Sequence, residues 1–314
     1  MNSKPLHIET PLLQSSKLRS SASRSVWLKL EALQPPGSFK IRGVGHACEE
    51  YRRRGAVRLL ASSGGNAGIA VAFAGRELSL PVIVVVPQST TDRAKELMRR
   101  EGAEVIVHGA SWQEAHTFAL SLLTPTDAFI HPFDDPLLWE GHATLIDEVA
   151  RAGLRPDATI LSVGGGGLFC GVVAGLQRNG LDRVPIVAVE TQGADSFAQS
   201  VRAGRLVTLP AITSIATSLG ARRVCAQALQ LAARHPVVNL VVSDRSALRA
   251  CERFLDDHRL LVEPACGAAL AVLYDGAPEL EAYRSLLVIV CGGVTASIEQ
   301  IQGWSARLRE THPR

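Results

Sequence analysis

One lysine of the chain stands where its amine could react with a carbonyl group. Lys40 follows the apolar run Val26–Leu30 and a turn that contains prolines and a glycine. These residues end the strand, and Ser38 is predicted to be the N-cap of the next helix, whose first turn carries Lys40. The partial positive charge at a helix start lowers the pKa of an amine, and a neutral amine attacks carbonyl carbon atoms. Lys40 is therefore a candidate nucleophile, and the alternative is a solvated lysine near a helix start.

Two glycine-rich turns could bind anions. The first, Ser62–Gly68, follows a predicted strand and opens a predicted helix. Its glycines let the backbone approach a ligand closely, and the amide groups at a helix start bind anions. A carboxylate or phosphate site is predicted here, because ligands lie at the carboxyl ends of parallel strands. The alternative is a tight turn with a serine cap.

The second turn, Gly164–Gly167, consists of four consecutive glycines. Consecutive backbone N–H groups form a nest that can hold a phosphate at a helix start. No Gly-Lys-Ser/Thr follows, so the turn is not a P-loop, and the Gly-x-Gly-x-x-Gly spacing fails as well. A phosphate is therefore predicted, without support for ATP or a dinucleotide. The alternative, close packing of a strand on a helix, rarely needs so many glycines.

A third strand end, Val288–Val290, leads to Cys291 and two glycines. A cysteine in such a place is most often a buried core residue, but its weak thiol donor could also meet a ring nitrogen of a heteroaromatic cofactor. An amine, a phosphate nest and a partner for a ring nitrogen suit a phosphate-bearing aldehyde. The sequence therefore predicts pyridoxal 5'-phosphate (PLP) as the cofactor.

Short runs rich in valine and isoleucine alternate with amphipathic segments along most of the chain. Apolar runs are typical of parallel strands that helices cover on both faces, so the predicted class is α/β with doubly wound sheets. The predicted strands are Val57–Ala61, Val82–Val86, Val105–His108, Ala128–Ile130, Thr159–Val163, Ile186–Glu190, Leu240–Ser243 and Leu286–Cys291. The predicted helices are Ala67–Leu78, Asp92–Glu101, Trp112–Leu122, Leu137–Ala152, Leu168–Asn179, Arg245–Asp257 and Ala296–Arg309.

A proline-rich break, His131–Pro136, is the best candidate for a crossing between domains. Together with the turn before Lys40, it predicts a discontinuous layout. Residues 1–39 and 133–314 would form a large PLP-binding domain, and residues 40–132 a small domain on the substrate side.

The composition is that of a globular enzyme. Of 314 residues, 46% are hydrophobic, 20% charged and 5% aromatic, and the formal net charge is +3. This balance indicates neither a nucleic-acid groove nor a membrane-binding patch, and no apolar run approaches membrane-spanning length. Six dispersed cysteines without a CxxC pair argue against zinc and disulfides, and with no secretory signal visible they favour the cytoplasm. The histidines lack paired ligand spacing, and His142 is predicted to be a hydrogen-bonded structural residue.

Taken together, the motifs resemble those of the fold type II PLP enzymes, whose fold is like that of the tryptophan synthase β subunit. Within them, the chain resembles the L-serine dehydratase/L-threonine deaminase group of the animal-liver type. The resemblance spans nearly the whole chain and rests on the blocks Gly37–Gly43, Ser62–Gly68, Phe133–His142, Gly164–Leu168, Val262–Ala269 and Val290–Gly293. It implies two doubly wound α/β domains with a discontinuous large domain, and a homodimer.

The resemblance also implies roles for single residues, with Lys40 as the catalytic lysine that binds the cofactor aldehyde. The cofactor would further contact Phe39, Asn66, Gly164, Gly165, Gly166, Gly167, Leu168 and Cys291. The substrate carboxylate would be held by Ser63, Gly64, Asn66 and Ala67. A monovalent cation such as K+, which prefers oxygen ligands, would lie near Gly164, Glu190, Ala194, Leu219 and Ala221.

The implied function is a PLP-dependent ammonia-lyase for L-serine and L-threonine, an α,β-elimination that gives pyruvate or 2-oxobutanoate plus ammonia. The alternatives are another fold type II reaction (β-replacement, racemisation or threonine synthesis), a non-catalytic amino-acid-binding relative, and a nucleotide-binding α/β protein. Gly64 stands where alanine is common in the family, and the missing methyl group is expected to lower catalytic power or loosen substrate choice. Glu263, before Pro264, is predicted only to cap a helix start.

Overall fold

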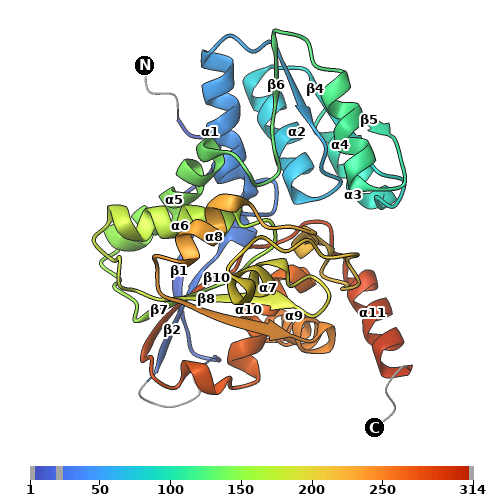
Figure 1. Ribbon diagram of the computed structural model, residues 1–314. Helices are drawn as coiled ribbons and strands as arrows, with labels where there is room; N and C mark the ends of the chain where they lie inside the picture. Colours follow the sequence, from blue (N-terminus) through green and yellow to red (C-terminus); the bar gives the residue numbers. More distant parts are fainter. Residues whose placement is uncertain (1–3, 19–23, 311–314) are drawn as a thin grey trace.

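The computed structural model describes residues 4–18 and 24–310 and contains two β-sheets (Figure 1). The parallel sheet β5-β4-β3-β6 is made of β3 (Arg58–Ala61), β4 (Val82–Val86), β5 (Glu104–Val107) and β6 (Asp127–Phe129). The larger sheet has the order β1-β2-β10-β7-β8-β9. Its strands are β1 (Leu12–Ser15), β2 (Ser25–Lys29), β7 (Ala158–Ser162), β8 (Ile186–Thr191), β9 (Val237–Val242) and β10 (Ser285–Ile289).

Helices cover both sheets. They are α1 (Lys40–Arg53), α2 (Asn66–Leu78), α3 (Asp92–Arg100), α4 (Trp112–Ser121), α5 (Pro136–Arg151), α6 (Gly167–Arg178), α7 (Ser196–Ala203), α8 (Ala226–Ala232), α9 (Asp244–His258), α10 (Pro264–Tyr274) and α11 (Ile298–Glu310). Short 3-10 helices are η1 (Glu31–Leu33), η2 (Thr217–Leu219) and η3 (Pro278–Leu280). No helix within residues 4–18 and 24–310 is long and apolar enough to cross a membrane.

The predicted α/β class with parallel sheets is confirmed. All the predicted strands and helices are present, with ends within two residues of the prediction except at β9, which starts three residues earlier. The structure adds the strand β1, which was not predicted and which pairs with β2 in the antiparallel sense. It also adds α7, α8 and α10. Helix α10 is buried on every side, so it lacks the amphipathic period that marks a surface helix.

The smaller sheet separates two apolar layers, as the alternation of side chains along a strand requires. In β4, Val84 and Val86 face the core under α2, while Val85 faces the opposite layer with Ala115 and Ala119 of α4. The sheet is therefore covered on both faces. Its carboxyl edge, where the loops before α2 and α3 begin, is the part left for a ligand.

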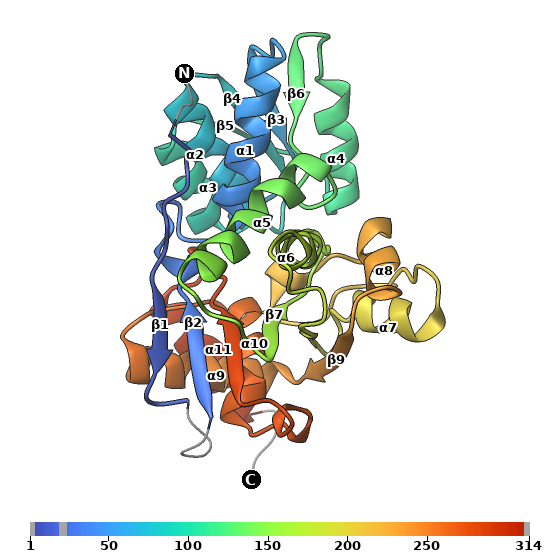
Figure 2. The ribbon, with the colours of Figure 1, turned by 90° about the vertical axis from the view of Figure 1, so that its left-hand side faces the viewer.

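Helix α5 connects the two sheets (Figure 2). Leu138 near its start belongs to the core of the smaller sheet, whereas Leu145 and Val149 belong to the core of the larger one. A β-carbon at Gly141 would lie 2.3 Å from the carbonyl oxygen of Arg42, so only glycine lets α5 approach α1 this closely.

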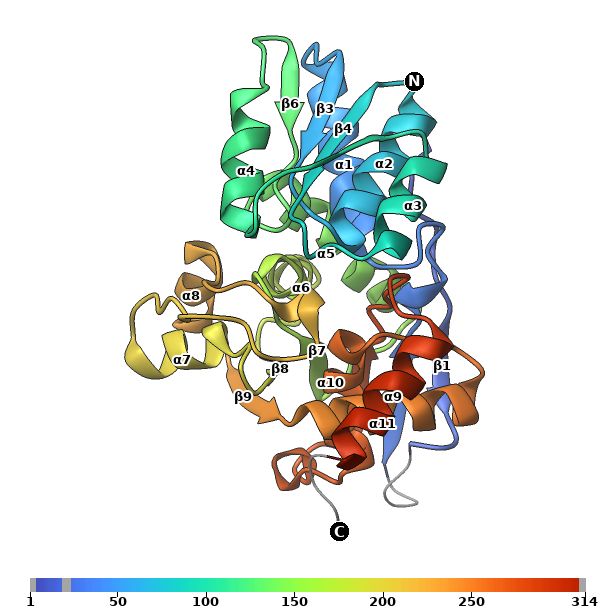
Figure 3. The same ribbon diagram turned by 90° about the vertical axis from the view of Figure 1, so that its right-hand side faces the viewer.

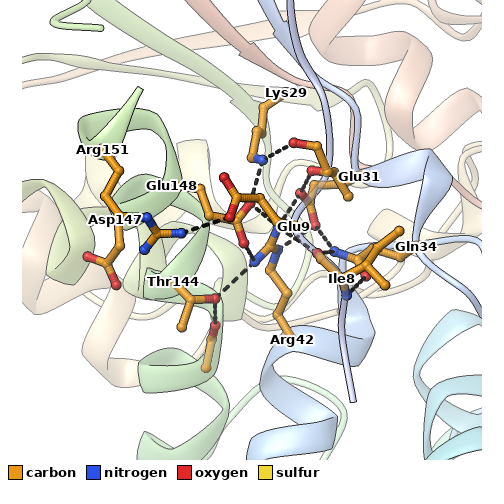
Figure 4. A network of polar contacts seen from close by, with 12 residues as sticks. Ile8, Glu9, Lys29, Glu31, Gln34, Arg42, Thr144, Asp147, Glu148 and Arg151 are labelled. Atoms are coloured by element: carbon orange, nitrogen blue, oxygen red, sulfur yellow. Dashed lines mark hydrogen bonds and ion pairs between the residues drawn. The ribbon is translucent and has the colours of Figure 1, made fainter. Parts of the chain in front are cut away.

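A buried polar network fixes α1 to α5 and β2 (Figure 4). Arg42 of α1 is fully buried and binds Glu31 and Glu148 through its guanidinium group, at N–O distances of 2.6 to 2.9 Å. Lys29 of β2 donates to Glu148 and to Thr10 O. Two cations therefore face two carboxylates in the dry interior, and the network holds the helix that carries Lys40.

Each sheet takes its strands from a separate part of the sequence. The smaller sheet uses residues 58–129, and the larger sheet uses residues 12–29 and 158–289. The exact division into residues 40–132 and the two flanking parts stays a prediction, because α5 packs on both sides of the proposed boundary.

Candidate active site

The first residues of α1 lie beside the segment that follows β10. Phe39 N donates to Cys291 O at 3.1 Å, and Ser38 forms an isolated bridge with Gly292. Phe39 therefore stands at the N-cap position, and the predicted capping role of Ser38 is wrong. The bridge keeps Ser38 in an extended pairing before the helix begins. Its hydroxyl group is buried and finds no hydrogen-bond partner in the described part of the chain.

Lys40 presents a reactive amine at this junction. Its Nζ donates to the carbonyl oxygen of Pro132 at 2.7 Å and lies 5.2 Å from the centre of the Phe39 ring. Burial lowers the pKa of Lys40 to about 8, although the nearby Cys291 and Glu263 raise it. A part of the amine, about a tenth at pH 7, is thus neutral, as a nucleophile or base requires.

The tetraglycine turn lies next to the residue that follows Pro132. A β-carbon on Gly165 would fall 2.2 Å from the ring of Phe133, and one on Gly167 would fall 2.8 Å from Phe133 O. Outside regular helices and strands, none of the four glycine amides donates to another backbone group of residues 4–18 and 24–310. Leu168 follows in the first turn of α6 and is buried. The turn thus offers open amide donors at a helix start.

A substitution at Gly166 tests whether the tetraglycine turn binds PLP. Replacing it with alanine is expected to weaken PLP binding about tenfold or more, because its φ of +94° disfavours a side chain and its β-carbon would lie 2.7 Å from Ala228 Cβ. Titration of the cofactor-free protein, followed by visible absorbance, measures the effect. Gly180→Ala is the matched control, since Gly180 has φ +66° and open space around it. Equal PLP affinities of the two variants would contradict the role of the nest.

Asn66 connects the two sheets at the site. Its Nδ2 donates to Glu263 Oε1 at 2.8 Å and to Ser218 Oγ at 3.3 Å, while its Oδ1 accepts from Val294 N at 3.2 Å. The side chain is 7% exposed. The position of its amide is therefore fixed by residues far away in the sequence.

Glu263 is a residue whose importance the sequence did not reveal. It stands at the N-cap position of α10, as predicted, but its side chain makes no capping bond. Its carboxylate turns instead into the site, where it accepts hydrogen bonds from Asn66 and from Thr295 Oγ1 at 2.8 Å. Burial raises the pKa of Glu263, while hydrogen bonds from Ser218, Thr295 and Asn66 oppose the rise. The only sequence signal was an acidic residue beside a proline.

The turn predicted to hold the substrate carboxylate lies between β3 and α2. Ser63, Gly64 and Gly65 are partly exposed, whereas Asn66 and Ala67 are buried as the first residues of the helix. Gly65 N donates to Ser63 Oγ at 3.4 Å. The amide groups at the start of a 13-residue helix favour an anion at this place.

Cys291 lies behind Phe39 with a protonated thiol. Its hydrogen bond with Cys266 and its burial raise the pKa of Cys291 well above the ordinary value. A neutral thiol is a weak donor, so it could contact a ring nitrogen without transferring a proton to it. The described cysteines are all free and buried.

The residues predicted near a cation form one connected region. A β-carbon on Gly164 would lie 3.0 Å from Leu219 Cα, and Ala221 N donates to Leu219 O at 2.7 Å. Glu190 accepts from the amides of Phe197 and Ala198. Burial raises the pKa of Glu190 to about 8 despite these bonds.

Ala194 N donates to Thr191 O, in the loop between Glu190 and α7. No group of three or more histidine, cysteine, aspartate or glutamate side chains suited to a metal exists in the described residues. Any cation here would therefore depend mainly on carbonyl oxygens.

His142 does not make the hydrogen bonds that were predicted for it. Both ring nitrogens are buried, and neither has a hydrogen-bond partner in residues 4–18 and 24–310, so the predicted satisfied structural role is wrong. The ring packs 4.9 Å from the Phe39 ring and against Gly43, which leaves no polar neighbour within reach. Burial lowers the pKa of His142 well below its usual range, with a further contribution from Lys40. A neutral ring therefore supports Phe39.

The residues fit PLP. The nest supplies open amides for a phosphate, and consecutive residues 132 and 133 link it to the amine of Lys40. The neutral thiol of Cys291 and the buried side chain of Asn66 lie at the same site. These are the groups that a phosphate-bearing pyridine aldehyde needs.

Comparisons with known proteins agree with this fit. A family model described as pyridoxal-phosphate dependent enzyme matches residues 4–292. The chain is similar to the L-serine dehydratase/L-threonine deaminase of Homo sapiens, with 46% identity over 99% of this chain and 98% of the relative. It is 49% identical to a serine dehydratase-like protein of Rattus norvegicus, over 98% of this chain and 97% of that protein.

A solved structure gives the same result. The L-serine ammonia-lyase of the fungus Rhizomucor miehei superposes with a TM-score of 0.91 and 35% identity, over 97% of this chain and 99% of that chain. The fold type II resemblance inferred from the motifs is thereby confirmed. This chain therefore belongs to the pyridoxal-phosphate dependent enzyme family and, within it, to the L-serine dehydratase/L-threonine deaminase group.

Proposed function

We propose that this protein is a PLP-dependent ammonia-lyase that acts on L-serine and L-threonine. The observation that carries the proposal is the pair Pro132 and Phe133, which joins the amine to the nest. Pro132 O accepts from Lys40 Nζ, and Phe133 packs on Gly165. This arrangement suits a cofactor with an aldehyde and a phosphate. The names of the similar proteins support serine and threonine as substrates.

In this proposal, the nest and Leu168 would hold the phosphate, Phe39 would lie against the ring, and Asn66 would contact the phenolic oxygen. Lys40 holds the cofactor through its aldehyde carbon. When bound, PLP withdraws electrons from the α-carbon of an amino acid and so makes its proton acidic. Cys291 keeps its proton and contacts the ring nitrogen as a weak donor.

Lys40 also moves the proton. With an amino acid bound at the cofactor, the free amine of Lys40 would be placed to accept the α-proton, and a pKa of about 8 leaves part of it neutral near neutral pH. The amides of Ser63, Gly64 and Ala67, with Asn66, hold the α-carboxylate at the start of α2. This contact fixes the α-carbon relative to Lys40 Nζ.

The overall reaction balances without an oxidant or reductant. The α-proton and the β-hydroxyl group leave serine as water, and one water then releases ammonia. L-Serine thus gives pyruvate and ammonia, and L-threonine gives 2-oxobutanoate and ammonia.

An assay with purified protein in potassium buffer tests the proposal. We expect a yellow protein that forms pyruvate from L-serine, detected through coupled lactate dehydrogenase. The same samples, with and without sulfide, are analysed for D-serine and β-substituted products. A yellow protein that yields only those products would favour racemase or replacement chemistry. A protein that cannot be loaded with PLP would overturn the proposal and favour a non-catalytic amino-acid-binding role.

Three further properties belong to the same proposal. A monovalent cation such as K+ lies near Gly164 and Glu190, and the assay repeated with a bulky organic cation tests it. The protein is a homodimer, which analytical ultracentrifugation checks. Its place is the cytoplasm, in keeping with free buried thiols in the described chain.

A further inference from the structure

The turn before α2 contains two adjacent residues without side chains, Gly64 and Gly65. Around Gly65 there is open space, with no surrounding atom within 4 Å of the place where a β-carbon would lie. At Gly64, by contrast, the position of a β-carbon is already occupied by Thr90. Thr90 Oγ1 lies 2.2 Å, Cγ2 2.9 Å and Cβ 3.1 Å from that position. Thr90 therefore occupies the volume that an alanine methyl group at position 64 would need. The expectation that the missing methyl group lowers catalytic power is thus replaced in this chain by a clash that the added methyl group would cause.

Thr90 stands on a well-fixed backbone. It lies between β4 and α3, and β4 pairs with β3, the strand that leads into the turn (Figure 3). Thr90 N donates to Pro87 O at 3.0 Å, and the next residue caps α3 through the bond from Ala94 N to Thr91 Oγ1. The Thr90 hydroxyl has no hydrogen bond to any other residue that the structure describes. Its side chain acts on Gly64 by packing.

This packing matters because glycines do not fix their own backbone conformation. Within the turn, Gly65 N donates to Ser63 Oγ only at the long distance of 3.4 Å. The residue before the turn, Ser62, is tied to His116 Nδ1 at 3.1 Å. Between this fixed strand end and the start of α2, Ser63 O packs against Gly68, and Thr90 closes the space beside Gly64.

We propose that Thr90 is a positioning residue for the substrate, which sets the place of the Ser63–Ala67 amides by filling the space behind Gly64. The identity of the substrate rests on the proposed function above. Since the carboxylate held by these amides is bonded to the α-carbon, a displaced turn moves the α-proton relative to Lys40 Nζ. A displacement of about 1 Å costs on the order of 100-fold in rate.

The proposal predicts reciprocal size changes. Thr90→Ala removes the packing, and Gly64→Ala drives a methyl group into Thr90, so each is expected to lower kcat/KM for L-serine about 10- to 100-fold. The loss in Thr90→Ala falls on kcat as well as on KM, because the displaced carboxylate also moves the α-proton away from Lys40 Nζ, and Thr90→Ser recovers part of it. In the double variant, the methyl group introduced by Gly64→Ala occupies the space that Thr90→Ala vacates. Its kcat/KM is expected to return to within about threefold of the starting protein, far above either single variant.

Controls separate positioning from folding. PLP affinity and the thermal unfolding midpoint are measured for each variant, and both are expected to stay near the values of the starting protein. Ser89→Ala, at the exposed neighbouring position, is expected to leave KM and kcat unchanged. The proposal is overturned if a folded, PLP-loaded Thr90→Ala protein keeps its kcat/KM, or if the double variant shows the product of the two single losses.

The same variants distinguish this proposal from the proposed function. If the starting protein forms no pyruvate, the ammonia-lyase proposal fails, but the binding of L-serine can still be followed through the visible absorbance of the PLP-loaded protein. The recovery of binding in the double variant then supports the role of Thr90. Purely additive losses of binding overturn it.

Discussion

Replacing Lys40 with alanine is expected to lower kcat for pyruvate formation at least about 1000-fold, because the variant lacks both the cofactor-binding amine and the base for the α-proton. The amine cannot be replaced by a neighbour. Among the described lysines, Lys29 is the one that is fully buried, and its amine is held by Glu148 and Thr10 O. Pyruvate release under saturating PLP and L-serine measures the loss.

Two control variants test whether another cationic side chain can replace Lys40 and whether the loss of any lysine lowers activity. Lys40→Arg keeps a positive charge near Pro132 O but has no nucleophilic amine, so it is expected to be as inactive as Lys40→Ala. Lys95→Ala, which removes a surface partner of Asp92, is expected to keep full activity. Turnover by either Lys40 variant near that of the starting protein would refute the assigned role.

The lowered pKa of Lys40 adds a pH dependence to the same result. Only the neutral amine attacks an aldehyde, and the amine becomes neutral as the pH rises through its pKa of about 8. The rate at which cofactor-free protein captures PLP is therefore expected to rise from pH 6 to pH 8 and then level off. With an unshifted lysine, the rise would continue to about pH 10.

Replacing Arg42 with methionine is expected to lower the free energy of unfolding by about 3–5 kcal/mol, because it leaves buried carboxylates without their main partner. With Arg42 present, two cations balance Glu31 and Glu148, and the variant would leave a net negative charge in the interior. Burial alone would lower the pKa of Arg42, but the charges and hydrogen bonds of the two glutamates outweigh it and raise the pKa. The guanidinium group therefore stays charged.

The urea midpoint of the cofactor-free protein measures this loss. Arg53→Met on the same helix is the matched control, because Arg53 pairs with Glu50 but is 73% exposed at its side chain. Solvent and salt screen such a pair, so its removal is expected to leave the midpoint nearly unchanged. Equal midpoints of the two variants would show that the buried network contributes no more than a surface pair.

The sequence by itself determined the α/β class and the turns that carry the chemistry. Each of these features is local: valine-rich runs mark the parallel strands, and glycines that follow a strand mark the turns before α2 and α6. The lysine, the tetraglycine nest and the cysteine were found in this way. The family resemblance added roles for these and other single residues, and all of these roles stay predictions.

Only the tertiary structure decided which distant residues meet. Glu263 binds Asn66 across 197 positions of the chain, and Arg42 binds Glu148 across 106. His142 lost its expected partners because Phe39 and Gly43 pack around it. Thr90 fills the space behind Gly64 because β3 and β4 are neighbours in the sheet. Such contacts depend on how strands and helices pack, and local periodicity carries no record of that packing.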